Sequence, residues 1–280
     1  MKRILLTGAG GQVGRELVRA LAPLGEVTAL DRQGLDLTRI DAIRTAIRAI
    51  KPQIIVNAAA YTAVDQAESE PELAAAINGQ APAAMAEEAK KLGALLVHYS
   101  TDYVFDGSQA HPYKEEDATH PLNAYGKTKL AGEAAIRNSG CRHLIFRTSW
   151  VYGLHGRNFL RTIGRLAQER QELSIVADQI GAPTWSRMIA GATALAVRGD
   201  PPDGLYHLSS AGATSWHGFA LAILDAHGWG GRLNAIPTRD YPTPATRPAN
   251  SLLDNGKLAK ELGLALPDWR AALALCLADG

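Results

Sequence analysis

The chain has 280 residues, of which 46% are hydrophobic and 20% charged, so it can form one large α/β unit or two modest lobes around a sizeable core. A formal net charge of +1 at pH 7 excludes the strongly basic surface of nucleic-acid and anionic-membrane binders, so neither partner is expected. No apolar run approaches the roughly 18 residues that span a bilayer, and no leader pattern precedes the first strand, so we expect a cytoplasmic protein.

The first predicted elements are a buried strand at residues 2–7, a glycine-rich turn and a helix. Strand, turn and helix in this order are the context of a dinucleotide-binding fingerprint. Gly8 permits the tight turn, Gly11 lets backbone N–H groups reach a pyrophosphate, and Gly14 lets the helix pack on the strand. The spacing is Gly-x-x-Gly-x-x-Gly rather than Gly-x-Gly-x-x-Gly.

The second predicted strand, residues 26–30, ends at Asp31, which lies 20 residues after Gly11. An acidic residue at this distance is expected to bind the hydroxyl groups of the adenosine ribose. Arg32 follows and is equally suited to a 2′-phosphate. The choice between NADH and NADPH therefore stays open.

A helix is predicted next, with Thr38 and Asp41 as a capping box and isoleucines at helical spacing on its buried face. A third buried strand follows at residues 53–56. The small residues 58–60 after it leave room for a flat ligand against the backbone.

An alanine-rich helix over residues 71–91 leads into a fourth strand at residues 94–99, which ends at Ser100 and Thr101. The carboxyl end of a central strand is where doubly wound sheets place their chemistry. Thr101 is therefore a candidate hydrogen-bond partner for a substrate oxygen, and the alternative is that both hydroxyl groups only cap a turn.

Tyr125 and Lys129 are four residues apart in a helix predicted to begin near Asn123, so they share one face. A free phenol titrates near ~10, and a lysine ammonium a few ångström away is expected to lower that pKa. The pair therefore predicts a proton donor and acceptor suited to carbonyl–alcohol interconversion. The alternative is a solvated helix face.

After a fifth strand at residues 144–147 the alternation of strands and helices loosens. Shorter pieces are predicted, among them helices over 158–169 and from Trp185, and strands at 173–176 and 204–208. The expected fold is α/β, a Rossmann-type doubly wound parallel sheet over residues 1–150, followed by a smaller C-terminal α/β lobe over 151–280 that holds substrate. The boundary is approximate, and segments of the second part are allowed to return to the first.

Taken together, these features resemble the dTDP-4-dehydrorhamnose reductase family of the extended short-chain dehydrogenase/reductase superfamily. The stretches that carry the resemblance are residues 7–14, 56–65, 100–107, 121–129, 147–152, 181–184 and 241–248. It implies reduction of the 4-keto group of dTDP-6-deoxy-L-lyxo-4-hexulose to dTDP-L-rhamnose with NADPH or NADH. A monomer or homodimer is expected.

The resemblance also implies roles for individual residues. Tyr125 would donate the proton, Lys129 would tune it and bind the nicotinamide ribose, and Thr101 would hold the keto oxygen. Asp102 and Trp150 would contact the sugar. The dinucleotide would be contacted by Gly11, Gln12, Val13, Asp31, Asp36, Leu37, Ala60, Tyr61, Thr62 and Tyr99, in addition to Gly8 and Gly14 of the turn.

No metal is expected in this chain. The eight histidines show no metal-binding spacing, and Cys141 and Cys276 lie far apart in apolar stretches typical of small buried side chains. Some relatives form a metal-bridged dimer through carboxylates on two helices. Glu16 is present here, but the helix after residue 185 has no matching carboxylate, so such a bridge is not expected.

Two other functions stay open on the same scaffold. A nucleotide-sugar dehydratase or epimerase is one, although a 4,6-dehydratase typically has Asp-Glu after the threonine and this chain has Asp102 followed by Tyr103. A cofactor-binding regulatory subunit without catalysis is the other, and the presence of Thr101, Tyr125 and Lys129 argues against it.

Overall fold

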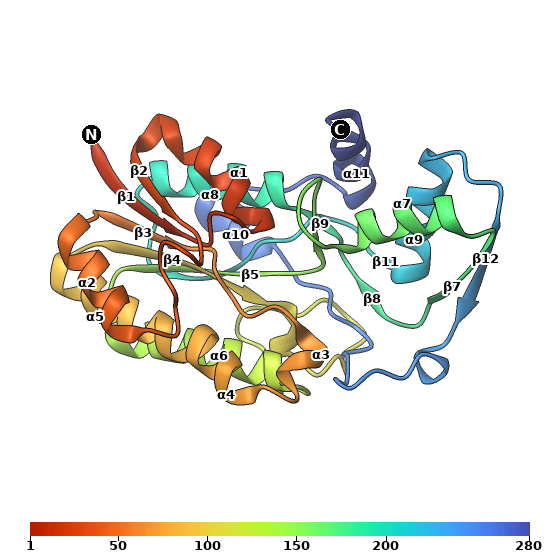
Figure 1. Cartoon of the computed structure of the whole chain (residues 1–280), viewed down its shortest axis with the longest axis horizontal. Coiled ribbons are helices and arrows are strands. Elements are labelled where there is room, and N and C mark those ends of the chain that lie inside the picture. Colours follow the sequence, from red (N-terminus) through yellow and green to blue (C-terminus); the bar gives the residue numbers. More distant parts are fainter.

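Six parallel strands form the central sheet of the computed structural model, which describes residues 1–280 (Figure 1). Their order is β10-β5-β4-β3-β1-β2. The bounds are β1 (Lys2–Thr7), β2 (Gly25–Leu30), β3 (Ile54–Asn57), β4 (Leu95–Thr101), β5 (His143–Thr148) and β10 (Gly204–His207). The chain passes outward from β1 to β2 and then crosses to β3 on the other side of β1, so the strand order reverses between β1 and β3. Ligands of doubly wound sheets bind at such a reversal.

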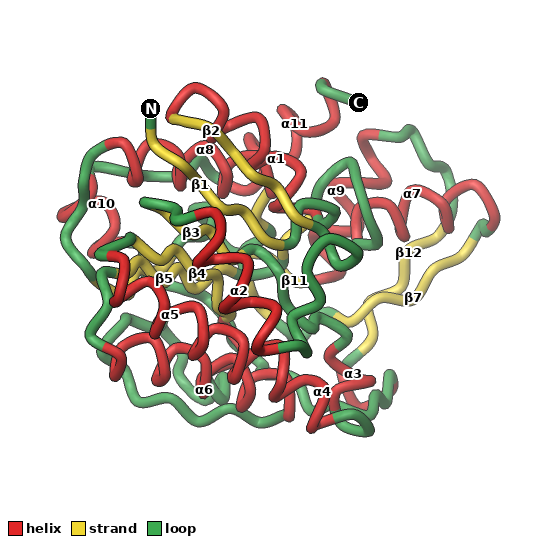
Figure 2. Tube along the Cα trace, turned by 60° about the vertical axis from the view of Figure 1, so that its left-hand side comes forward, coloured by secondary structure: helices red, strands yellow, loops and turns green.

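Helices cover both faces of the sheet, as the predicted fold class requires (Figures 1 and 2). One face packs against α1 (Gln12–Leu21), α8 (Ser186–Arg198) and α10 (Gly256–Leu262). The opposite face packs against α2 (Ile40–Ile50), α5 (Ala81–Leu92) and α6 (Ala124–Ser139). Successive strand residues alternate between the two cores: Ile4 and Leu6 enter the first and Leu5 the second. The predicted Rossmann-type sheet is confirmed.

A separate hydrophobic core lies in the second half of the chain, at the right of Figure 1. It is built from α7 (Phe159–Glu169), β7 (Glu172–Val176), α9 (Trp216–Ala226) and α11 (Trp269–Ala278), with β12 (Arg232–Ile236) paired to β7. Short strand pairs link this part to the sheet: β6 (Val151–Tyr152) with β9 (Thr184–Trp185), and β8 (Ile180–Gly181) with β11 (Thr214–Ser215).

Three elements from beyond residue 150 belong to the first unit. β10 pairs with β5 at the edge of the central sheet, and α8 and α10 pack on its first face. These are the returning segments that the approximate boundary allowed. The role of the remaining part as a substrate-binding lobe stays a prediction.

The helix predicted over residues 71–91 is divided in the structure. α4 (Pro71–Ala75) continues through a π-helical turn, η2 (Ala76–Gln80), into α5. The π-turn contains Asn78, whose side chain bonds the backbone of Tyr61 in both directions and donates to the Thr128 hydroxyl at 3.2 Å. A π-turn inside a helix is frequent at functional sites. Here it joins the segment after β3 to α6.

The predicted capping box at the start of α2 is wrong. Thr38 donates its hydroxyl and its backbone N–H to Asp36, and α2 begins without a side-chain cap. Thr38 therefore closes a local turn with Asp36, because hydrogen bonds between such near neighbours compete with helix capping.

Both cysteines are buried and unpaired, as predicted. No helix is long and apolar enough to cross a membrane.

Candidate active site

The glycine turn between β1 and α1 has the close backbone packing that the fingerprint predicts. Gly8 has a φ of 76°, and a Cβ at this position would lie 2.5 Å from the Ala59 nitrogen. A Cβ on Gly14 would lie 2.0 Å from the Gly8 carbonyl oxygen. Gly11 is the N-cap residue of α1, and no side chain caps the helix. The first amides of α1 are therefore available to an anionic ligand.

We expect Gly14→Ala to destabilise the chain by about 1–3 kcal/mol and to weaken coenzyme binding, because the added methyl group meets backbone that cannot move aside. Gly191→Ala on α8 is the matched control, since nothing lies within 4 Å of a Cβ there. Urea denaturation and calorimetric titration with NADPH would measure both effects. Equal behaviour of the two variants would show that the turn tolerates a side chain.

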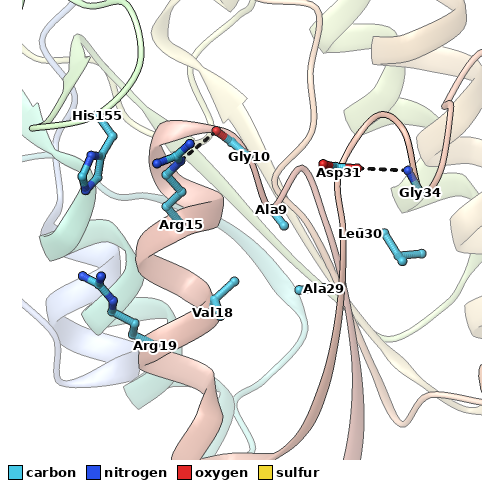
Figure 3. Close-up of a pocket in the computed structure, with 10 residues that line it drawn as sticks. All are labelled: Ala9, Gly10, Arg15, Val18, Arg19, Ala29, Leu30, Asp31, Gly34 and His155. Atoms are coloured by element: carbon cyan, nitrogen blue, oxygen red, sulfur yellow. Dashed lines mark hydrogen bonds between the residues drawn. The ribbon is translucent and has the colours of Figure 1, made fainter.

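A pocket of about 560 Å³ lies beside this turn, between α1 and the end of β2 (Figure 3). It is lined by Ala9, Gly10, Arg15, Val18, Arg19, Ala29, Leu30, Asp31, Gly34 and His155. One carboxylate oxygen of Asp31 accepts the backbone N–H groups of Gln33 and Gly34, both at 3.0 Å, and the other makes no hydrogen bond within the chain. The second oxygen of Asp31 is thus free to accept a hydrogen bond from a ligand, and its contact with a ribose hydroxyl stays a prediction.

The positive groups at this pocket are Arg15 and Arg19 of α1, not the predicted Arg32. Two arginines four residues apart on the helix that follows a glycine turn share one face, and this spacing was the available signal. An acid and two arginines together suit a ribose with or without a 2′-phosphate.

Other predicted coenzyme contacts lie around the carboxyl edge of the sheet. Gln12 accepts a hydrogen bond from Asn158 at 2.8 Å, and Val13 packs on the first core. The carboxylate of Asp36 holds Thr38, whose backbone and hydroxyl hydrogen bonds lower the Asp36 pKa. Leu37 is buried in the second core.

The segment after β3 contains Ala60, Tyr61 and Thr62 and lies beside the point where the strand order reverses. The Tyr61 hydroxyl donates to Glu70 at 2.7 Å, and the Thr62 side chain is exposed. The Tyr99 hydroxyl is buried against Thr193 of α8 at 2.7 Å, so only the Tyr99 carbonyl is directed toward the neighbouring Lys129. Contact of these residues with a dinucleotide stays a prediction.

Thr101, Asp102 and Tyr125 converge at the carboxyl end of β4. The Thr101 hydroxyl donates to the Asp102 carboxylate at 2.9 Å and accepts the Tyr103 N–H at 3.1 Å. Asn123 caps α6 by accepting the Gly126 N–H at 2.8 Å, which sets Tyr125 in the first turn. Gly126 is required there, because a Cβ would lie 2.2 Å from the Tyr103 carbonyl oxygen.

The electrostatics of Tyr125 differ from the prediction. Burial raises the pKa of Tyr125 to about 12; the Thr101 hydroxyl lowers it in part, and the Asp102 charge raises it further. Lys129 is not among the groups that shift it. The prediction that the lysine ammonium lowers this pKa is therefore wrong for this structure.

The reason lies in where Lys129 points. Its Nζ donates to the Tyr99 carbonyl oxygen at 2.5 Å and lies 3.2 Å from His98 Nε2, in the interior between α6 and β4. Burial lowers the pKa of Lys129 to about 8, with the charge of Glu133 opposing that change. A shared helix face thus brought the two side chains to one site without directing the ammonium at the phenol.

Asp102 has the properties of a substrate-binding group. It is 3% exposed, and burial raises its pKa to about 7, against the hydroxyls of Ser251 and Thr101. Its Oδ2 has no hydrogen-bond partner. An unpartnered buried carboxyl oxygen fits a ligand hydroxyl, because such a group is costly to leave unsatisfied.

Trp150 lies at the junction with the second part of the chain. It has a φ of 46° and stacks on Trp216 of α9, with ring centroids 3.6 Å apart. A Cβ on Gly181 would lie 2.4 Å from the Trp150 ring. The sequence pattern did not indicate Trp216, because it is distant in the chain and carries no motif.

Asp65 and Arg247 join two of the stretches that carry the resemblance. The guanidinium bonds both carboxylate oxygens, at 3.0 and 2.8 Å, and this hydrogen bonding lowers the Asp65 pKa. The pair joins the segment after β3 to the proline-rich loop over 241–248, and Arg247 lies near Tyr103. Only the fold reveals it, since the residues are 182 positions apart.

Glu16 pairs with Arg187 of α8 at 3.1 Å, and Arg187 also pairs with Asp279 at 2.5 Å. Glu16, which the resemblance linked to a metal-bridged dimer, is thus bound by an arginine of its own chain. No group of three or more His, Cys, Asp or Glu side chains is arranged to hold a metal ion.

Known proteins of one family are similar to this chain over its whole length. The model of the family described as the RmlD substrate binding domain matches residues 1–280. A dTDP-4-dehydrorhamnose reductase of Burkholderia thailandensis is 50% identical, covering 99% of this chain and 98% of the relative. One of Escherichia coli K12 is 49% identical, over 96% and 95%.

A solved structure of dTDP-4-dehydrorhamnose reductase from Bacillus anthracis in complex with NADP superposes with a TM-score of 0.96 at 36% identity, covering 100% of this chain and 99% of that one. A UDP-glucose 4-epimerase of Thermus thermophilus in complex with NAD, at 21% identity and a TM-score of 0.80, shares the fold. With the glycine turn, the Thr101–Tyr125–Lys129 site and the match over the whole length, the chain belongs to the dTDP-4-dehydrorhamnose reductase family.

Proposed function

We infer that this chain is an NAD(P)H-dependent oxidoreductase that reduces the 4-keto group of dTDP-6-deoxy-L-lyxo-4-hexulose to dTDP-L-rhamnose, the final step of dTDP-rhamnose biosynthesis. The observation that carries this function is the convergence of Thr101, Asp102 and Tyr125 at the carboxyl edge of the sheet. Thr101 and Asp102 lie at the end of β4, which neighbours β3, and the reversal where this fold binds dinucleotides is between β3 and β1.

The residues present fit a dinucleotide. We propose that the uncapped amides of α1 after Gly11 bind the pyrophosphate and that Asp31, with Arg15 and Arg19, binds the adenosine end. Gln12, Val13, Asp36, Leu37, Ala60, Tyr61, Thr62 and Tyr99 complete the proposed coenzyme site. When bound, the reduced nicotinamide supplies the hydride.

Tyr125 supplies the proton to the sugar oxygen in this mechanism. Its raised pKa keeps the phenol protonated at neutral pH, as a proton donor requires. Thr101 is held beside it by Asp102 and the Tyr103 amide, and it orients the keto oxygen. We propose that Asp102 and Trp150 contact the sugar and that Lys129 contacts the nicotinamide ribose.

The test is consumption of NADPH and of NADH with the dTDP-4-keto sugar, with the stereochemistry of the product determined by NMR. We expect oxidation of both coenzymes and formation of dTDP-L-rhamnose. Nucleotide binding without oxidation would favour a regulatory subunit. NAD retained through purification would favour a dehydratase or epimerase, although Tyr103 stands where the second carboxylate of a 4,6-dehydratase is expected.

Oligomeric state and location remain proposals. We propose a monomer or a homodimer without a bridging metal, because Arg187 already neutralises Glu16. A cytoplasmic location is proposed for the same protein. Sedimentation with and without EDTA, and cell fractionation, would test the two statements.

A further inference from the structure

Trp150 has a backbone conformation that is unusual for its place in the fold. Its φ of 46° lies in the left-handed region, which a bulky side chain rarely adopts. The two other non-glycine residues with a positive φ, Lys51 and Asp200, lie at the ends of α2 and α8, where this conformation is common. Trp150 instead lies between β5 and β6. Such strain persists only where the surrounding structure holds it, and it gathers at ligand sites.

The segment over residues 181–184 holds the backbone on both sides of Trp150. Before it, the Ser149 hydroxyl donates to the Ala182 carbonyl oxygen at 2.8 Å. At Trp150 itself, the carbonyl oxygen accepts the Thr184 N–H at 3.2 Å. Directly after it, β6 pairs with β9. The strained backbone is therefore fixed by hydrogen bonds to one neighbouring segment.

Two contacts hold the indole ring of Trp150. Trp216 stacks on it, with ring centroids 3.6 Å apart and an interplanar angle of 5°. Gly181 lies directly against the ring, since a Cβ there would be 2.4 Å from Cε2 and 2.7 Å from Nε1. Both contacts come from one pair of strands, because Gly181 of β8 is paired with Thr214 of β11 and Trp216 directly follows β11. The β8–β11 pair therefore fixes the ring at two places.

Trp216 is itself held in place by the second half of the chain. It is the first residue of α9, which Ser215 caps by accepting the Gly218 N–H at 3.0 Å. Its ring also packs on Phe159 of α7, with centroids 4.7 Å apart. Trp150 and Trp216 are both half-buried, so part of the stacked pair reaches solvent. The stack thus connects a fixed aromatic cluster to a ring that a ligand can contact.

We propose that Trp216 is a positioning residue for the sugar, which together with Gly181 holds the Trp150 ring in one orientation before the substrate binds. This inference rests on the proposed function, in which Trp150 contacts the sugar. Without the stack, substrate binding has to order the ring, and the free energy of that ordering is lost from the affinity. The glycine turn belongs to β1 and α1, and Tyr125 belongs to α6. Coenzyme binding and proton transfer should therefore not depend on Trp216.

Trp216→Leu removes the flat partner and keeps an apolar side chain. The interaction of an aromatic pair corresponds to about 2- to 10-fold in affinity, so we expect W216L to raise KM for the dTDP-4-keto sugar by this factor. The kcat and the Kd for NADPH should stay unchanged. Trp216→Phe retains an aromatic face and should recover most of the loss. Trp229→Phe is the control, since Trp229 packs on the same core and donates to the Arg170 carbonyl instead.

Gly181→Ala disturbs the ring from its second contact while Trp216 is intact. The added methyl group overlaps the ring, so the ring has to move, and KM for the sugar should rise as in W216L. Gly191→Ala is the matched control, because nothing lies within 4 Å of a Cβ there. The indole N–H signal of Trp150, assigned with Trp150→Phe, reports the ring position by NMR. We expect it to shift in W216L and in G181A but not in W229F.

A wild-type KM in W216L and G181A would overturn the proposal, and so would a loss of NADPH binding together with sugar affinity, which marks a structural role. If W216L does not fold, G181A and W216F decide the question.

Calorimetric titration with dTDP-L-rhamnose separates this inference from the proposed function. A wild type that oxidises no NAD(P)H with the keto sugar refutes the proposed function. If it still binds dTDP-L-rhamnose and W216L binds more weakly, the positioning role stands. Equal binding by the two proteins, or no binding by the wild type, refutes that role.

Discussion

Tyr125→Phe is expected to lower kcat by about 10²–10⁴-fold, the range lost when a positioned general acid is removed. The phenol is the group that faces both Thr101 and Asp102, and burial keeps it protonated at neutral pH. The ring itself packs edge-on against Tyr103, with centroids 5.9 Å apart. Phenylalanine preserves this packing, so NADPH binding should be unchanged. Stopped-flow oxidation of NADPH and calorimetric titration would measure the two quantities.

Tyr152→Phe is the control for this substitution. Tyr152 is buried in the separate hydrophobic core of the second half of the chain, and its hydroxyl has no hydrogen-bond partner, so its loss should leave turnover unchanged. Near-normal kcat in Y125F would refute Tyr125 as the proton donor. Loss of coenzyme binding together with turnover would assign the tyrosine a structural role instead.

Arg147→Met should lower the free energy of unfolding by about 3–5 kcal/mol, the typical cost of removing one partner of a buried ion pair. Arg147 of β5 donates to both carboxylate oxygens of Glu133, at 2.9 and 2.7 Å, and each side chain is at most 2% exposed. Its guanidinium also lies 5.0 Å from the centre of the Phe105 ring. Methionine leaves the Glu133 charge buried without a partner.

Two further variants separate the charge from the packing. Glu133→Gln combined with R147M should recover part of the loss, because no buried charge is then unpaired. Arg142→Met removes a pair with Asp200 at the surface, where both side chains are exposed, and should cost at most about 1 kcal/mol. Urea denaturation of the four proteins would measure these differences. If R147M and R142M lowered the free energy of unfolding equally, the buried pair would contribute no more to stability than the surface pair.

The buried pair also bears on the active site. Glu133 lies on α6 one turn after Lys129, and its charge acts on the lysine pKa. α6 carries Tyr125, Lys129 and Glu133. The ion pair between Glu133 and Arg147 of β5 is therefore coupled to the protonation of Lys129. We therefore expect R147M to alter the pH profile of turnover as well as stability, and a profile identical to that of the wild type would contradict this coupling.

The sequence by itself determined the sheet, the glycine turn and the helix of Tyr125 and Lys129. These features depend on local periods: apolar runs form buried strands, glycines at fixed spacing form the turn, and residues four apart on a helix share a face. The positions of Asp31 and Thr101 were predictable for the same reason, since Asp31 directly follows β2 and Thr101 is the last residue of β4.

Only the tertiary structure decided how these residues act. Lys129 turns to His98 and the Tyr99 carbonyl, and Trp150 stacks on Trp216, and none of these partners follows from spacing. Arg15 and Arg19 of α1 line the pocket beside the glycine turn together with the end of β2 and Asp31, whereas Arg32 is not among its lining residues. Hydrogen-bond direction and desolvation depend on neighbours from other strands and helices, and so the lowered pKa of Lys129 and the raised pKa of Tyr125 appear only after the chain has folded.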